Sequence, residues 1–116
     1  MKILTLKACD TCHKALGFLS DEGIEVENHD IRQDGLPDDV LRHVVQTAGW
    51  EKAVNKRSTT WRNLDEADKV DLDDEKAIAL ITTHPTLMKR PVFLMGDEVL
   101  IGFDNAMQAE LVRRFG

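Results

Sequence analysis

The chain has 116 residues, 42% of them hydrophobic and 31% charged, and its 15 basic and 21 acidic side chains give a formal net charge of −6. A surface that binds phosphates broadly needs an excess of lysine and arginine, so this balance argues against direct binding to nucleic acid or to anionic membranes. No apolar run approaches the roughly 18 residues of a membrane span, and the first residues lack the apolar region of a secretory signal. We therefore expect one cytoplasmic domain over residues 1–116.

The first third of the chain predicts a strand, a helix and a second strand. Residues 2–7 (KILTLK) are short and apolar enough for a buried strand. A helix is predicted from about Asp10 to Asp21 with Gly23 as its stop, and residues 24–31 (IEVENHDI) alternate as a strand does. Two strands joined by one helix form a βαβ unit, so these strands should be parallel.

The remaining elements are mostly helical until a hairpin near the end. Apolar residues repeat at helical spacing over 37–48, residues 50–72 resemble short helices, and an acidic first turn opens another helix at Asp73. Two short apolar strands then flank Gly96-Asp97, and a last helix begins after its N-cap, Asp104. The order of elements is βαβ, several helices and then ββα, which is an α/β fold.

The segment CDTCH at residues 9–13 is compatible with three kinds of chemistry. C-x-x-C-H attaches c-type haem, but such proteins are exported and no export signal is visible. Zinc needs three or four ligands. Cys9 and Cys12 supply two, and the remaining histidines outside this segment are scattered singly (His29, His43 and His84). We therefore expect no metal site and no bound cofactor.

Redox chemistry suits the position of these cysteines best. Cys9 stands where the first strand meets the first helix, so its sulfur should lie beside the free N–H groups of the first turn. Their partial positive charge favours thiolate over thiol. Cys12 is three residues further on, on the same helical face, and is close enough to form a disulfide. Cys9 would be the nucleophile and Cys12 the resolving thiol, whereas the structural alternative is two buried thiols that never react.

Two arginines and a proline are candidates to complete the site. Arg90 stands directly before Pro91 and the hairpin, and Arg57 lies in the helical segment NKRSTTW. Arginine is usually a solvated side chain, but its guanidinium binds carboxylates and other oxyanions in a two-pronged fork. Arg57, Arg90 and Pro91 are therefore candidates for binding substrate. The sequence leaves open whether Pro91 is cis.

Several ordered motifs resemble the arsenate reductase (ArsC)/Spx-like family. They are the cysteine at the start of a helix, IRQDGL at 31–36, NKRSTTWRNL at 55–64 and HPTLMKRPV at 84–92. The resemblance covers nearly the whole chain and is closest to the branch of small bacterial glutathione-dependent thiol reductases.

The resemblance implies a thioredoxin-like fold with a mixed four-stranded sheet and a helical insertion at about 36–84. Cys9 then matches the nucleophilic cysteine of the family, and Arg57 and Arg90 match two arginines of the arsenate site. Pro91 matches the proline that is cis in thioredoxin-like folds and faces the reactive cysteine.

Two departures from the family pattern shape the functional expectations. Arsenate reductases carry a third arginine where this chain has Gly102, so weak or absent arsenate reduction is expected. Cys12 is the second departure, because Spx-type regulators have C-x-x-C and arsenate reductases of this type do not.

The favoured hypothesis is a glutathione-linked thiol–disulfide oxidoreductase, with glutathione as co-substrate or a glutaredoxin- or thioredoxin-type protein as reductant. The alternative is a redox-sensing regulator that binds the α-subunit of RNA polymerase.

Overall fold

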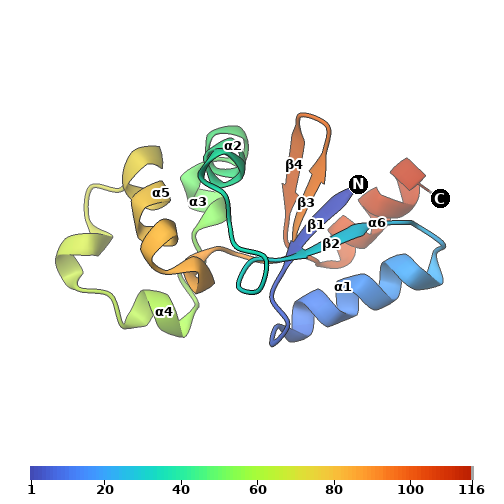
Figure 1. Cartoon of the computed structure of the whole chain (residues 1–116), viewed down its shortest axis with the longest axis horizontal. Coiled ribbons are helices and arrows are strands. Elements are labelled where there is room, and N and C mark those ends of the chain that lie inside the picture. Colours follow the sequence, from blue (N-terminus) through green and yellow to red (C-terminus); the bar gives the residue numbers. More distant parts are fainter. Residues whose placement is uncertain (116) are drawn as a thin grey trace. The chain divides into compact units, whose positions relative to one another are not determined.

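The computed structural model describes residues 1–115, and these form two compact units. The first unit joins Met1–Asp34 to the C-terminal segment from Arg90, and the second is Gly35–Lys89. Figure 1 labels the elements of both units. The second unit covers the segment in which the helical insertion is expected, and the assignment of the whole chain to one domain stays a prediction.

The first unit is built on one four-stranded mixed sheet. Its strands are β1 (Lys2–Thr5), β2 (Glu27–Asp30), β3 (Val92–Met95) and β4 (Glu98–Ile101), in the order β2-β1-β3-β4. β1 runs parallel to β2, as the βαβ pattern predicts, and antiparallel to β3, which forms a hairpin with β4. The predicted α/β fold with a mixed four-stranded sheet is confirmed.

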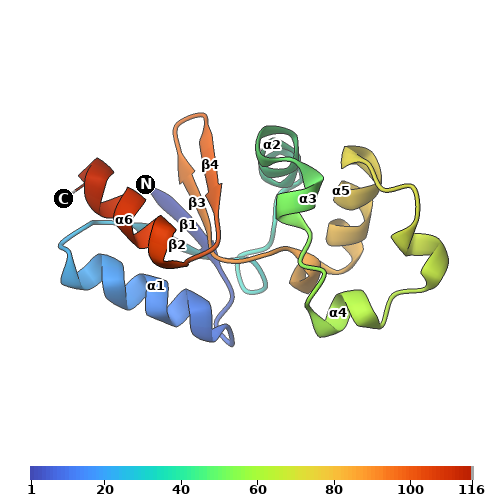
Figure 2. The ribbon, with the colours of Figure 1, turned by 180° about the vertical axis from the view of Figure 1, so that it is seen from behind.

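Two helices pack on one face of this sheet, α1 (Asp10–Asp21) and α6 (Asn105–Phe115). Ile3 of β1 lies opposite Phe93 of β3, so their side chains share a face. Both are fully buried in one core with residues of the two helices (Ala15, Leu19 and Leu111). Figure 2 shows the ribbons of α1 and α6 beside the strands.

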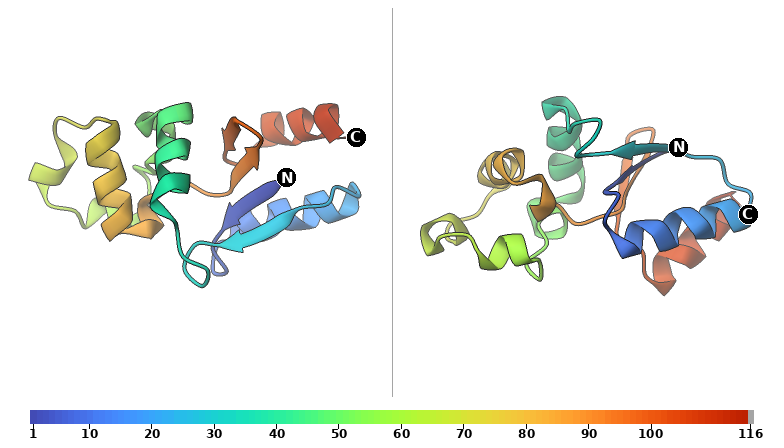
Figure 3. Two further views of the ribbon diagram at one scale, coloured as in Figure 1. Left: turned by 45° about the horizontal axis from the view of Figure 1, so that its top comes forward. Right: turned by 60° about the horizontal axis from the view of Figure 1, so that its bottom comes forward.

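The second unit is helical. It contains α2 (Asp38–Ala48), α3 (Trp50–Ala53), α4 (Thr59–Arg62), the short 3₁₀ helix η1 (Glu66–Lys69), α5 (Asp74–Thr83) and a second 3₁₀ helix, η2 (Pro85–Leu87). Figure 3 shows α2 and α5 from two further directions. Val54 and Met88 are buried and form an isolated antiparallel bridge. The other large buried side chains come mainly from α2 and α5 (Leu41, Val44, Val45, Ile78, Ile81 and Leu87).

Candidate active site

Cys9 caps the N-terminus of α1. The chain leaves β1 and turns at residues 6–9, where the Cys9 N–H donates to the Leu6 carbonyl at 2.9 Å. Cys9 has extended backbone angles (φ −94°, ψ 113°), and its Sγ accepts the backbone N–H of Cys12 at 3.4 Å. The sulfur thus replaces the oxygen of an ordinary N-cap residue, at the helix end that favours negative charge.

Arg90 lies beside this sulfur, and Pro91 follows it in the chain. The Arg90–Pro91 peptide bond is cis, and the buried Pro91 accepts the Gly102 N–H on its carbonyl at 2.9 Å. The Arg90 side chain forms a hydrogen bond with the Cys9 sulfur. The first unit therefore brings together three of the predicted site residues near the start of α1, namely Cys9, Cys12 and Arg90, with Pro91 next to Arg90 in the chain.

The two thiols differ in acidity. Burial raises the pKa of the Cys9 thiol, but hydrogen bonds from the side chain and backbone of Cys12 and from Arg90 outweigh it, so the pKa falls below its ordinary 9.0. Burial raises the pKa of Cys12 to about 12, and the hydrogen bond that its thiol donates to Cys9 acts in the same direction. Cys12 is 0% exposed, whereas Cys9 is partly exposed, and neither is in a disulfide. The arrangement favours an accessible Cys9 thiolate held by a protonated Cys12.

Arg57 belongs to the second unit. Its side chain is exposed, and its backbone N–H donates to the Asn55 side-chain carbonyl at 3.0 Å. The role of Arg57 in binding substrate stays a prediction that rests on the family resemblance.

Across residues 1–115, no group of three or more His, Cys, Asp and Glu side chains is arranged to hold a metal ion. His13 is the fourth residue of α1, and its side chain is exposed. The described helices also include none that is long and apolar enough to cross a membrane.

A cavity next to the cysteine loop was missed at the sequence level. Its lining comes from the residues that precede Cys9 and from those that follow β2, including Lys7, Asp30 and Arg32. The signal was available, because β1 and β2 are parallel and the segments after them meet at one edge of the sheet. The motif IRQDGL contributed to the family resemblance but was not considered as part of a site.

A sequence model of the ArsC family matches residues 4–111, which is most of the chain. This chain belongs to the ArsC family. The ArsC assignment confirms the resemblance drawn from the motifs, and it is consistent with a cysteine-based redox site at Cys9.

Other ArsC-like proteins align over almost their full length. An uncharacterised protein of Haemophilus influenzae is 48% identical over 100 residues, which cover 86% of this chain and 88% of that protein. The solved structure of the YFFB (PA3664) protein superposes with a TM-score of 0.88 at 37% identity, covering 96% of this chain and 97% of the other. The global transcriptional regulator Spx of Lactiplantibacillus plantarum is 25% identical over 115 residues, covering 97% of this chain and 83% of the regulator. The relatives of this chain thus include a protein described as a transcriptional regulator.

Proposed function

We propose that this protein is a thiol–disulfide oxidoreductase that uses glutathione as its thiol co-substrate and Cys9 as its nucleophile. The observation that supports it most directly is the environment of the Cys9 sulfur. An N-cap position, a hydrogen bond from the Cys12 N–H and a hydrogen bond with Arg90 all stabilise a thiolate that is still partly exposed. A thiolate is the form that attacks disulfides.

The reaction has two exchange steps. In the first, the Cys9 thiolate attacks the glutathione sulfur of a glutathionylated substrate; a Cys9–glutathione disulfide forms and the substrate sulfur leaves as a thiolate, which takes up a proton. In the second, a glutathione thiolate attacks that mixed disulfide, so Cys9 is released and glutathione disulfide forms. The net reaction consumes one free glutathione, which is oxidised into glutathione disulfide while the substrate sulfur is reduced to a thiol, and no other reductant is needed.

Cys12 acts in this scheme as a hydrogen-bond donor to Cys9. Its side chain is 0% exposed and its high pKa keeps it protonated near neutral pH, which favours release of the mixed disulfide by a second glutathione. Arg90 stabilises the Cys9 thiolate, and Pro91, joined to Arg90 by a cis peptide bond, is retained as a candidate for contacting the substrate. Arg57 is retained as a candidate for holding a carboxylate of the substrate.

The test is reduction of a glutathione mixed disulfide of 2-mercaptoethanol, coupled to glutathione reductase. Cys9→Ser should abolish turnover, whereas Cys12→Ser should retain most of it, with no Cys9–glutathione adduct accumulating when the protein is examined by mass. Unchanged turnover in Cys9→Ser would remove Cys9 as the nucleophile. Loss of turnover in Cys12→Ser, with the adduct accumulating, would replace the second glutathione by Cys12 as the resolving thiol.

A redox-sensing regulator is the second candidate function. The C-x-x-C segment and the Spx relative aligned over 97% of this chain favour it. A pull-down with the RNA polymerase α-subunit, on oxidised and on reduced protein, tests this function. Redox-dependent retention would support it, and no retention in either state would exclude it.

Arsenate reduction is expected to be absent. Gly102 lies where the family pattern has a third arginine; it is buried at φ +97°, and it brings no guanidinium to the site. Arsenite release in the presence of glutathione and glutaredoxin is the direct measurement, and release at a rate comparable with disulfide reduction would contradict this expectation.

A further inference from the structure

A cavity of about 330 Å³ opens where the chain leaves β1 and β2. It is lined by Leu6, Lys7 and Ala8, which directly precede Cys9, and by Asp30, Arg32 and Gln33, which end β2 and follow it. Clefts at the carboxyl ends of neighbouring parallel strands are common places for ligands in α/β folds. Ala8 of the lining directly precedes Cys9, the proposed nucleophile, in the chain.

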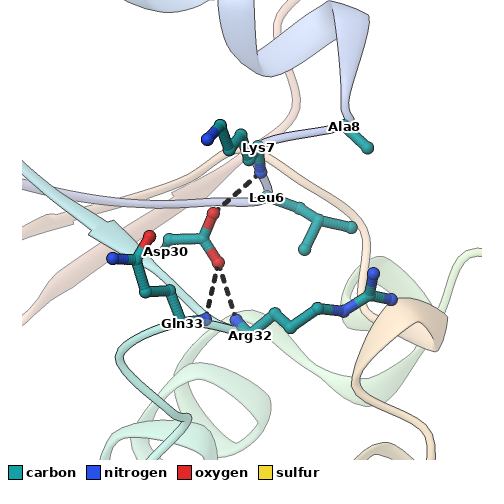
Figure 4. A pocket seen from close by; sticks show the side chains of 6 residues that line it. All are labelled: Leu6, Lys7, Ala8, Asp30, Arg32 and Gln33. Carbon is teal, nitrogen blue, oxygen red and sulfur yellow. Dashed lines mark hydrogen bonds between the residues drawn. The ribbon is translucent and has the colours of Figure 1, made fainter.

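The one carboxylate in the lining is already engaged by backbone donors. One Asp30 oxygen accepts the Lys7 N–H at 2.8 Å, and the other accepts the N–H groups of Arg32 at 2.8 Å and Gln33 at 3.0 Å. Figure 4 shows all three bonds converging on this side chain. These hydrogen bonds, chiefly the one from Gln33, lower the pKa of Asp30, so it stays ionised and ties the two loops together.

Arg32 is the cation that remains available. Figure 4 shows its side chain extending beside Leu6, on the side of the cavity where Ala8 lies, while the Lys7 ammonium points to the other side. The Arg32 side chain is exposed, and within residues 1–115 no carboxylate forms an ion pair with its guanidinium. The lining thus combines an apolar wall from Leu6 and Ala8 with the Arg32 guanidinium, whose charge also contributes to the lowered pKa of Asp30, although the whole chain carries a net charge of −6.

We propose that this cavity is the subsite for a carboxylate of the thiol co-substrate, and that Arg32 is its anchor. The inference rests on the proposed function, because it states how the same site selects its thiol. A guanidinium binds a carboxylate through two parallel hydrogen bonds, and the wall of Leu6 and Ala8 contacts the methylene groups next to it. The ligand class is a thiol that bears a carboxylate, such as a short peptide thiol, in preference to a neutral thiol.

Binding and kinetics are measured with one pair of matched variants. Arg32→Gln removes the guanidinium and leaves the Arg32 backbone bond to Asp30 in place. The control is Arg113→Gln, at the C-terminal end of α6, where Figure 1 shows the helix far from the start of α1. The binding probe is S-methylglutathione, which cannot undergo exchange, and its diethyl ester serves as the ligand without free carboxylates.

Calorimetry should show that Arg32→Gln weakens S-methylglutathione binding about fivefold, the loss that corresponds to one partly exposed charged contact. Arg113→Gln should bind as wild type does, and the diethyl ester should bind all three proteins with the same weak affinity. In the coupled assay, the KM for glutathione should rise about fivefold in Arg32→Gln with kcat unchanged.

The outcomes separate this inference from the proposed function. Equal binding of S-methylglutathione by Arg32→Gln and wild type, or no binding by wild type, overturns the subsite, even if Cys9-dependent turnover is intact. Selective weakening in Arg32→Gln supports the subsite even if no mixed disulfide is turned over, in which case the proposed function fails. An Arg32→Lys variant that binds as weakly as Arg32→Gln assigns the effect to the guanidinium fork, and one that binds as wild type assigns it to charge; both support the subsite.

Discussion

Burial raises the pKa of both cysteine thiols, yet only Cys12 ends with a raised value. The difference comes from the direction of the hydrogen bonds, because Cys9 accepts from Cys12 and Arg90 while Cys12 donates. A donor to sulfur favours the thiolate, and donating its own proton favours the thiol. At this site, hydrogen bonding therefore sets which of two neighbouring cysteines has the lowered thiol pKa.

Replacing Cys12 tests this division of roles. Cys12→Ala removes the thiol donor but keeps the backbone N–H, so the Cys9 pKa should rise toward 9.0, the ordinary thiol value. Cys12→Ser restores a donor and should keep the Cys9 pKa closer to that of wild type. The measurement is the rate of alkylation by iodoacetamide as a function of pH. Identical profiles for wild type and Cys12→Ala would show that the Cys12 thiol does not stabilise the Cys9 thiolate.

Cys12 should also make the fold sensitive to alkaline pH. In the unfolded chain its thiol loses a proton near pH 9.0, whereas in the folded protein it holds the proton to about pH 12. The unfolded state then binds fewer protons, so the free energy of unfolding falls as pH rises through this window, by at most about 1.4 kcal/mol per pH unit. Urea unfolding between about pH 9 and pH 11 should show a steeper loss in wild type than in Cys12→Ala. Parallel slopes would contradict the raised pKa.

The residues of the candidate site were predictable to different degrees for physical reasons. Cys9 follows from its position between a strand and a helix, since local sequence determines a helix N-terminus. The cis Arg90–Pro91 bond and the hydrogen bond between Arg90 and Cys9 depend on pairing of β1 with β3, nearly ninety positions apart in the chain, and only the family resemblance pointed to them. The motifs gave no role to Arg32 in a site. Its place in the cavity follows only from the folded structure, where the segments after β1 and β2 meet.

At the scale of single elements, the helices match the sequence patterns more closely than the strands do. The helix predicted from about Asp10 to Asp21 has those bounds, because the Cys9 cap and the glycine stop at positive φ are local signals. The strand predicted over 24–31 is confined to Glu27–Asp30, since only these residues pair with β1. Ile24 is buried in the core although it precedes the strand. Alternation of apolar residues alone could not separate a buried residue before the strand from a residue paired within it.

The cap of α6 gives a prediction about one element. The Asp104 carboxylate accepts the Met107 N–H at 2.8 Å, as its predicted N-cap role requires. Asp104→Ala leaves this N–H without its acceptor and should lower the free energy of unfolding by about 1 kcal/mol. Asp104→Asn keeps an acceptor oxygen and serves as the control, with a stability close to wild type. Urea midpoints measure both, and equal loss in the two variants would show that charge matters here and not the cap.

At the scale of the whole molecule, each unit has its own buried side chains. Leu19 belongs to the core of the first unit with Ile3 and Phe93, whereas Ile81 is fully buried in the second unit on α5, which packs against α2. The redox site and the Arg32 cavity both lie in the first unit. Cys9 chemistry should therefore depend on the first core more directly than on the second.

Two matched truncations test this dependence. Leu19→Ala and Ile81→Ala each remove a fully buried side chain and should each cost about 2–5 kcal/mol locally. Native-state hydrogen exchange should show Ile81→Ala lowering the protection of amides in α2 and α5 more than that of amides in β1 and β3, and Leu19→Ala doing the reverse. Exchange lowered equally in both units by either variant would mean that the chain opens as one cooperative body. In that case the second unit would support the Cys9 site energetically as much as the sheet does.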